Sequence, residues 1–227
     1  MSILKNIWDQ LSSHNQNEEQ AFHSFMAHVQ KASSYYKKEP KRHHALEDLI
    51  RIILKPIQCK HIAHSYTVQP HFAIKAIEVS DFFPFCLPDT TLHAYHKDLH
   101  GVLHLRRDIV FPTTWHPSSL ISSLALIQDT QNNFEQSTNH LVTLLLPFRI
   151  GFVTNGNHSI AQGILKGNGV IQPSSVIDVH NLLPKITFDG RYWLKNENGN
   201  VLGQPRYKEF GWVWEAYKCF YPVDFQT

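Results

Sequence analysis

The segment Phe152-Val-Thr-Asn-Gly-Asn-His-Ser-Ile-Ala161 passes from an apolar run into a helical pattern through a short polar turn. A strand that leads straight into a helix exposes unpaired backbone N–H groups, and the helix dipole adds about half a positive charge there. Gly156 permits a positive φ and a close backbone approach, and Asn155 and Asn157 tolerate unusual backbone angles. We therefore expect an anion, most naturally a phosphate, to bind at this turn.

Two further side chains give the turn chemical capacity. His158 can donate a hydrogen bond to a phosphate or exchange a proton near neutral pH. Ser159 can cap the helix or donate to an anion. In the plainer alternative, Asn155-Gly156 forms a tight turn and Asn157 is the helix N-cap. The residue types alone favour that alternative.

The apolar runs around the turn predict strands and a helix in a fixed order. We predict buried strands over 141–146 and 150–153, separated by Pro147, and a helix over 158–166 that ends at Gly167. Extended segments follow at 170–171 and 175–179. The centre of the chain is therefore predicted to be a β-α-β unit.

The remaining segments predict an α/β (α+β) protein with a small mixed sheet, an N-terminal helical extension and a C-terminal β-hairpin and aromatic segment. Helices are expected over 18–38, over 44–55 where Pro56 stops the second one, and over 117–134. Strands are expected over 72–79 and, as two short pieces, within 99–111. A hairpin is expected over 186–202, and the aromatic residues from Phe210 to Tyr221 are expected to pack as core and lid.

We expect three parts along the chain: a helical element over 1–65, an α/β core over 66–185, and a hairpin with the aromatic segment over 186–227, packed on the core. Hydrophobic residues make up 42% and charged residues 18%, which is typical of a globular protein and excludes wholesale disorder. Three widely spaced cysteines fit a reducing cytosol. With no apolar run near the roughly 18 residues that span a bilayer, we expect a cytoplasmic protein with no membrane partner.

The turn and its flanks resemble the ParB/sulfiredoxin-like superfamily, in which a strand leads through a Gly-Gly-His-Arg or Asp-Gly-Asn-His-Arg turn into a helix with an early alanine. Gly156, His158 and Ala161 stand in the matching places. Segment 77–82 resembles the first strand of that family and its exit, and 167–179 resembles its glycine and closing strands. The Asn-Gly-Asn-His-Ser turn also suggests kinship with a group of uncharacterised bacterial proteins.

The resemblance implies a nucleoside triphosphate, with Mg²⁺, bound at Asn155, Gly156, Asn157, His158 and Ser159. Members of the superfamily include CTP-dependent DNA-partition proteins, ATP-dependent sulfinic-acid reductases, small-molecule kinases and nucleases. For phosphoryl transfer it implies His158, Glu78 and Asp81 as catalytic candidates, since related kinases place an acidic group at the exit of the first strand.

Two departures from the family pattern weaken the catalytic interpretation. The reactive cysteine of sulfiredoxins is replaced here by Gly156 or Asn157, which makes reductase chemistry improbable. The arginine that follows the histidine is Ser159, so a bidentate phosphate clamp is lost. The cations that could replace it are Arg106, Arg107, Arg149 and Lys166.

Other functions remain open on the sequence. One alternative is a non-catalytic binding or regulatory module in a bacterial defence or mobile-element system, with the turn serving only as a cap. Another is a metal-dependent nuclease, for which the basic cluster Lys37, Lys38, Lys41 and Arg42 is the support. A net charge of +2 does not by itself imply nucleic-acid binding. The 16 histidines, including His93, His96, His100 and His104, make a zinc site conceivable, but Gly101 interrupts their helical spacing.

Overall fold

The chain combines helices with small sheets, which confirms the predicted mixed class. The computed structural model describes residues 2–67, 74–83, 91–94, 96–115, 118, 121–122 and 134–222. It separates into two compact units, one formed by 1–49 with 183–227 and the other by 50–182. The first unit therefore joins both ends of the chain, whereas the sequence suggested boundaries near 65 and 185 with the two ends as separate parts.

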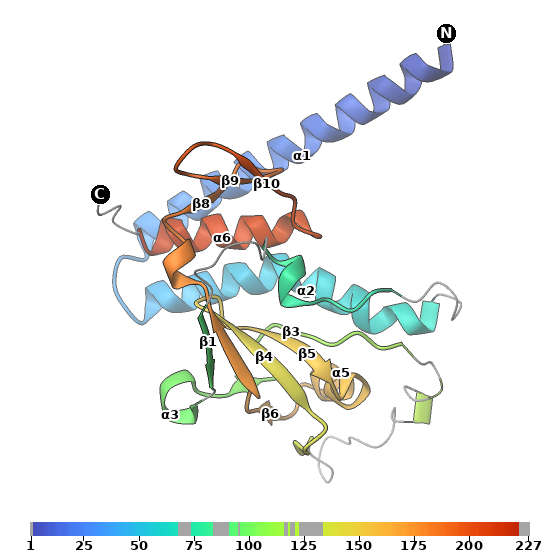
Figure 1. Cartoon of the computed structure of the whole chain (residues 1–227), viewed down its shortest axis with the longest axis vertical. Coiled ribbons are helices and arrows are strands. Elements are labelled where there is room, and N and C mark those ends of the chain that lie inside the picture. Colours follow the sequence, from blue (N-terminus) through green and yellow to red (C-terminus); the bar gives the residue numbers. More distant parts are fainter. Residues whose placement is uncertain are drawn as a thin grey trace. The chain divides into compact units, whose positions relative to one another are not determined.

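The first unit is built on two helices that contact each other, α1 (Ser2–Tyr35) and α6 (Lys208–Phe220) (Figure 1). The ring of Phe22 on α1 meets Phe188 edge-on, with ring centroids 5.7 Å apart, and lies 6.1 Å from the ring of Trp212 on α6. These aromatic contacts help to explain why segments more than 160 residues apart in sequence form one unit, since buried aromatic rings contribute much contact area to a core.

A three-stranded antiparallel sheet completes the first unit. Its strands are β8 (Ile186–Phe188), β9 (Trp193–Lys195) and β10 (Val201–Gly203), in the order β10-β9-β8. The predicted hairpin is thus confirmed and gains a strand. The aromatic segment that follows is helical. Its aromatic side chains recur at every second position over 210–214. Because that spacing differs from the helical period of 3.6, the sequence pattern did not indicate a helix here.

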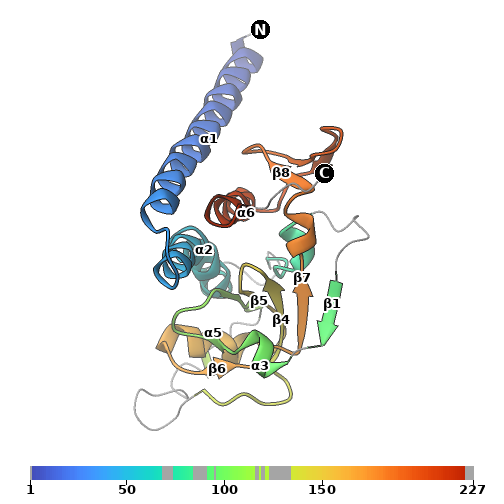
Figure 2. The ribbon, with the colours of Figure 1, turned by 90° about the vertical axis from the view of Figure 1, so that its left-hand side faces the viewer.

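The second unit contains a five-stranded mixed sheet in the order β1-β7-β4-β5-β3, and Figure 2 labels the first four of these strands. Strands β4 and β5 form an antiparallel hairpin, β4 runs parallel to β7, and β5 runs parallel to β3, while β1 lies antiparallel to β7. The strand bounds are β1 Thr91–Ala94, β3 Val110–Phe111, β4 Leu141–Leu146, β5 Ile150–Asn155 and β7 Ser175–Asp178.

Short elements complete the second unit. A two-stranded ladder joins β2 (Leu103–His104) to β6 (Val170–Ile171). The remaining elements are helix α3 (Lys97–His100) and two 3₁₀ turns, η2 (Val79–Asp81) and η3 (His180–Leu182). Helix α2 (Lys41–Thr67) contributes its residues after Leu49 to this unit and the earlier ones to the first.

Apolar side chains are buried on both faces of the five-stranded sheet. Helix α5 (Asn157–Lys166) packs its residues Ile160, Ala161 and Ile164 against Val142 and Leu144 of β4. The successive side chains of a strand alternate between faces, so Phe152 of β5 projects away from α5. On that face Phe152 contacts the rings of Phe82 and Phe111. Burial on both sides explains why these strands read as continuous apolar runs.

The predicted strands 141–146 and 150–153, the helix 158–166 and its Gly167 end are confirmed. The β-α-β interpretation needs correction, because the strands before and after α5 are not neighbours. Strand β7 pairs with β4, and β5 lies on the other side of β4 and runs antiparallel to it. Strands β5 and β7 are therefore antiparallel to each other and lie on opposite sides of β4, so α5 does not connect two neighbouring parallel strands.

Three other predictions have different outcomes. The strand predicted over 72–79 is wrong where it is described, since 74–78 has no regular structure and 79–81 forms the 3₁₀ turn η2. Pro56 does not stop a helix, because α2 continues through it to Thr67. Most of the helix predicted over 117–134 lies outside the described residues, although Ser118, Ile121 and Ser122 are helical.

Packing explains why α2 passes through Pro56. A proline inside a helix removes one backbone hydrogen bond and costs about 3 kcal/mol. Beyond it, Ile57 and Ile62 are buried, and the side-chain amide of Gln58 donates to the carbonyl of Val110 over 2.6 Å. Tertiary contacts of this kind override the local preference. None of the helices in the described ranges is both long enough and apolar enough to cross a bilayer.

Candidate functional site

The predicted turn lies where the carboxyl ends of two parallel strands meet. Strands β3 and β5 pair in parallel, with Val110 opposite Gly151 and Phe111 opposite Phe152. The chain leaving β3 passes through Thr113 and Trp115, and the chain leaving β5 enters the turn at Asn155, so both exits share one edge of the sheet. This edge is where ligands bind in many α/β proteins.

Gly156 forms the start of α5. It adopts the left-handed conformation, with φ 81° and ψ 23°, and occupies the N-cap position. No side chain caps the helix, so the prediction of Asn157 as the N-cap is wrong, and Ser159 does not cap it either. The N–H groups of Asn157 and Ser159 donate to no acceptor within the described part of the chain. The turn therefore keeps the uncapped donors that an anion site requires.

Both asparagines of the turn stabilise the loop through their side chains. The Asn155 side-chain oxygen accepts from the N–H of Gly156 over 2.9 Å. The Asn157 side-chain oxygen accepts from the N–H of Thr113 over 2.7 Å. Asn157 thus ties the start of α5 to the segment that leaves β3. These oxygens hold the turn in place, because both are engaged in hydrogen bonds within the protein.

Thr113 connects four segments of the second unit. Besides the contact with Asn157, its hydroxyl lies 3.0 Å from Nδ1 of His61 on α2 and 3.4 Å from the N–H of Ile77. Thr113 is only 3% exposed and His61 is fully buried. The next residue, Thr114, donates to the carbonyl of Ile62 over 3.0 Å. This network fixes the backbone on the β3 side of the site.

An exposed tryptophan lies beside the predicted histidine. The Trp115 ring is 62% exposed, and its centroid lies 5.5 Å from that of His158 in an edge-to-face arrangement. Because Thr113 and Thr114 are fixed by hydrogen bonds, the backbone that carries Trp115 is held in place. The site therefore presents an aromatic surface next to the free N–H groups of α5. Such a surface can stack against a planar ligand.

The side chain of His140 packs against the turn at Gly156. A Cβ added at Gly156 would lie 2.4 Å from the His140 ring, so only glycine fits at this position. The backbone N–H of Ser137 donates to Nδ1 of His140 over 2.8 Å, which places the proton of the neutral ring on Nε2. Burial lowers the pKa of His140. The residue is a neutral packing partner of the turn near neutral pH.

The two predicted acidic candidates belong mainly to the η2 turn. The Glu78 N–H donates to Asp81 Oδ2 over 3.0 Å, and the pair forms a capping box around the 3₁₀ turn. Lys75 lies 3.8 Å from Glu78 and 4.0 Å from Asp81. Ile77, which precedes Glu78, contacts Thr113, and so brings this segment to the edge of the site. Glu78 is the more exposed carboxylate of the two.

The cations expected to replace the missing arginine lie elsewhere. Arg149 immediately precedes β5, at the end of the strand opposite the turn, and its guanidinium donates to the carbonyls of His100 and Val102. Lys166 lies at the C-terminal end of α5, and Arg106 lies beside Gly167 at that same end. Arg107 pairs with Asp108 over 3.2 Å. An anion at the turn would therefore depend on backbone N–H groups, His158 and Ser159.

The histidines form no metal centre in the described ranges. No group of three or more His, Cys, Asp and Glu side chains with metal-binding geometry occurs there. The backbone N–H of His96 donates to Nδ1 of His100, which places these two residues in a local turn. His93 belongs to β1, and its side chain lies outside the described residues.

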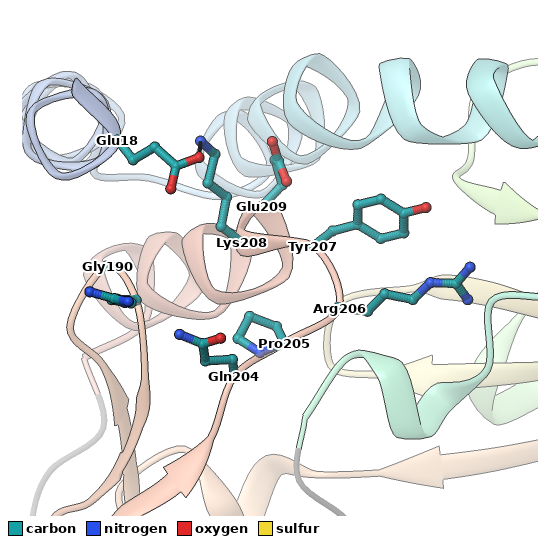
Figure 3. Close-up of a pocket in the computed structure, with 9 residues that line it drawn as sticks. Glu18, Gly190, Gln204, Pro205, Arg206, Tyr207, Lys208 and Glu209 are labelled. Atoms are coloured by element: carbon teal, nitrogen blue, oxygen red, sulfur yellow. Dashed lines mark hydrogen bonds and ion pairs between the residues drawn. The ribbon is translucent and has the colours of Figure 1, made fainter. Parts of the chain in front are cut away.

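The first unit has a cavity of about 400 Å³ that the sequence did not predict (Figure 3). It lies between α1, the β8–β9 turn and the segment that enters α6. Lys208 donates to Glu18 across it over 2.7 Å, and the Lys208 ammonium lies 5.8 Å from the centre of the Trp212 ring. In Figure 3, Tyr207 and Arg206 point away from this ion pair. The cavity's best-defined contact is thus an internal ion pair.

Sequence reasoning found the turn but missed Thr113, Trp115 and His140. The signal for the first two was present, because Pro112 ends an apolar run and is followed by Thr-Thr-Trp. Nothing in the sequence shows that β3 pairs with β5, about 40 residues away.

The chain belongs to a family of unknown function, DUF6710, whose model matches residues 7–227. No curated protein and no solved structure matches the chain significantly.

Proposed function

We propose that this member of the DUF6710 family binds a nucleotide at the edge where β3 and β5 end. The observation that carries the proposal is the meeting of two features there: the uncapped start of α5 and the exposed ring of Trp115 beside His158. A helix start with free N–H groups suits a phosphate, and an aromatic surface next to it suits a base. The resemblance to ParB/sulfiredoxin-like proteins points to the same class of ligand.

In this proposal each residue of the turn has a separate role. Gly156 lets the backbone approach the phosphate, and Asn155 and Asn157 keep the loop in shape. The N–H groups of Asn157 and Ser159 and the hydroxyl of Ser159 donate to phosphate oxygens. His158 adds a donor and, when protonated, a positive charge. The proposed ligand is a nucleoside triphosphate with Mg²⁺. The proposed location of the protein is the cytoplasm.

Turnover is the less supported part of the proposal. Mg²⁺ is commonly held by one or two carboxylates together with the phosphates, and Glu78 is the more exposed of the two acidic candidates, although Lys75 lies 3.8 Å from it. Asp81 is engaged by the backbone of Glu78. The residues thus fit a metal brought in by the nucleotide better than a resident metal. For hydrolysis or phosphoryl transfer, His158 is the proposed proton carrier, with Glu78 and Asp81 as weaker catalytic candidates.

Isothermal titration calorimetry of the full chain with ATP, CTP and GTP, each with Mg²⁺, tests the binding. We expect at least one nucleotide to bind, and we expect His158→Ala and Trp115→Ala each to weaken that binding about tenfold, as loss of one good contact does. Lys166→Ala, at the opposite end of α5, is the control and should bind like the wild type. Absence of binding by all three nucleotides, or binding that neither site variant changes, would refute the proposal.

The second candidate function is a non-catalytic binding or regulatory module whose turn is only structural. The internal bonds of both asparagines and the distant positions of all four candidate cations favour it. Asn157→Ala separates the two functions. A structural turn predicts a loss of roughly 1 kcal/mol of stability with no ligand response in either protein. If the turn binds a nucleotide, Asn157→Ala should lose this stability and should also bind the nucleotide more weakly than the wild type does.

A further inference from the structure

The turn between α1 and α2 concentrates the positive charge of the protein. Residues 35–42 read Tyr-Tyr-Lys-Lys-Glu-Pro-Lys-Arg and hold four of the 21 Lys and Arg residues but one of the 19 Asp and Glu residues. The other 219 residues therefore carry 17 basic and 18 acidic side chains, a net charge of −1. This segment, here called the basic turn, accounts for the net positive charge of the chain.

The lysines of the basic turn are exposed, and the structure records no ion pair for them among the residues it describes. Lys37, Lys38 and Lys41 are exposed, and none of them has an acidic partner within the described part of the chain. The one local carboxylate, Glu39, accepts from the Tyr221 hydroxyl over 2.8 Å and from the His43 N–H over 3.2 Å. The three lysine charges are thus available to an outside partner.

Helix stability does not explain these positions. The first turn of α2 holds Lys41, Arg42 and two histidines, with no acidic residue. Cations at a helix start oppose the helix dipole and destabilise the helix, although Glu39 just before the helix offsets part of this effect. Arg42 is held by the protein itself, because its guanidinium carbon lies 4.7 Å from the centre of the Tyr221 ring. A role in binding accounts for the exposed lysine at this position, where folding disfavours positive charge.

Two adjacent tyrosines add aromatic surface to this charge. Tyr35 is 80% exposed and Tyr36 is 36% exposed, and their rings meet edge-to-face with centroids 4.9 Å apart. The two rings give the basic turn an aromatic surface that solvent can reach. Stacking of unpaired bases on aromatic rings, with lysines on the backbone phosphates, is the usual basis of single-strand recognition.

We propose that the basic turn binds single-stranded nucleic acid, with Lys37, Lys38 and Lys41 on phosphates and Tyr35 stacked against a base. A duplex offers phosphates but no unpaired base, and an anionic membrane offers charge without a base to stack. The exposed ring pair therefore favours the single strand. The site is separate from the proposed nucleotide site, because it lies in the first unit and shares no residue with it.

Fluorescence anisotropy of the full chain with a labelled oligonucleotide of about 12 nucleotides tests the proposal. Three or four phosphate contacts predict a slope of log K against log salt of roughly −2 to −3. Lys37→Gln with Lys38→Gln should reduce the size of that slope by about 1.4. The matched control is Lys97→Gln with Lys166→Gln, two exposed lysines of the second unit, and it should leave the slope unchanged.

The stacking contact is tested separately. Tyr35→Ala should weaken binding at least about fivefold, whereas Tyr35→Phe, which keeps the ring, should bind like the wild type. Circular dichroism confirms that each variant is folded. The proposal is overturned by any of three results: no binding at low salt, equal losses in the two lysine pairs, or Tyr35→Ala binding like Tyr35→Phe. Binding that depends on the same lysines but occurs only with a duplex or with phosphatidylserine vesicles would also overturn it.

Discussion

At the scale of single residues, Gly156 and His140 determine the form of the turn together. The glycine is required because its backbone is left-handed and because any Cβ would collide with the His140 ring. The histidine is neutral because it is buried and because its Nδ1 accepts a backbone hydrogen bond. The two residues are an example of a local conformation that is fixed by a contact from another part of the chain.

The stability of the protein should depend on pH through His140. Burial lowers its pKa below the ordinary 6.5, so the unfolded chain binds a proton that the folded chain refuses. Its contribution is complete above about pH 6.5 and is lost as the pH falls from there toward the lowered pKa, at no more than about 1.4 kcal/mol per pH unit. Urea unfolding of the wild type and of His140→Asn between about pH 5 and 7.5 measures this term.

The matched control for this measurement is His23→Asn, since the His23 side chain is 68% exposed and its ion pair with the similarly exposed Glu19, at 3.8 Å, contributes little to stability. We expect the wild type and His23→Asn to lose stability in parallel on acidification, and His140→Asn to lose less. A slope in His140→Asn equal to that of the wild type would show that His140 does not contribute.

The site was predictable from sequence only as far as its local part. Asn155-Gly156-Asn157 followed by a helical pattern identifies a strand-to-helix turn, because turn residues and helix periodicity are local properties. Thr113 and His140 join the turn through pairing of distant segments, and no local pattern encodes that pairing. For the same reason the four candidate cations could not be excluded in advance, although all four lie away from the turn.

At the scale of elements, α6 packs closely against β8 through a glycine. A Cβ at Gly211 would lie 2.3 Å from the ring of Phe188, which is 2% exposed. The helix therefore approaches the strand more closely than any other residue type would allow. Trp214 of the same helix donates its indole N–H to the carbonyl of Ile186 over 3.2 Å.

Gly211→Ala should destabilise the protein although alanine is the better helix former. Propensity alone predicts a gain of about 1 kcal/mol. The collision with Phe188 predicts a loss of about 1–3 kcal/mol, and we expect this term to prevail because the ring is buried and cannot move aside. Urea unfolding measures the change. Adding Phe188→Leu should recover part of the loss, and a Gly211→Ala protein more stable than the wild type would contradict the packing.

Elements whose sequence pattern is local and strong were predicted well. Strands β4 and β5 are continuous apolar runs bounded by proline and asparagine, and α5 ends at a glycine that adopts the left-handed conformation. The sequence failed to predict two features, the continuation of α2 beyond Pro56 and the helical form of α6, for different reasons. Tertiary packing overrode the proline, and α6 buries aromatic side chains at positions that a strand would also use.

At the scale of the whole molecule, the two units should respond independently to packing defects. Each has its own buried core, and Gly163 in α5 is constrained in the second unit as Gly211 is in the first, with an added Cβ 2.4 Å from Leu105. Hydrogen exchange followed by mass spectrometry should show faster exchange in α1, α6 and β8–β10 for Gly211→Ala, and in β4, β5 and α5 for Gly163→Ala.

Each of these two variants serves as the control for the other. If either change accelerates exchange equally in both sets of elements, the chain unfolds as one cooperative body and its two units are not energetically separate.

The division of the first unit between the two ends of the chain also has a consequence for synthesis. Residues 1–49 are translated before the rest of the first unit, which begins at residue 183, so 133 residues must be translated in between. At 5–20 residues per second this interval is roughly 7–27 s. The second unit can complete its sheet during that time, while Phe22 of α1 still lacks Phe188 and Trp212, the rings against which it packs. Until α6 is made, the exposed ring leaves α1 open to premature association with other chains.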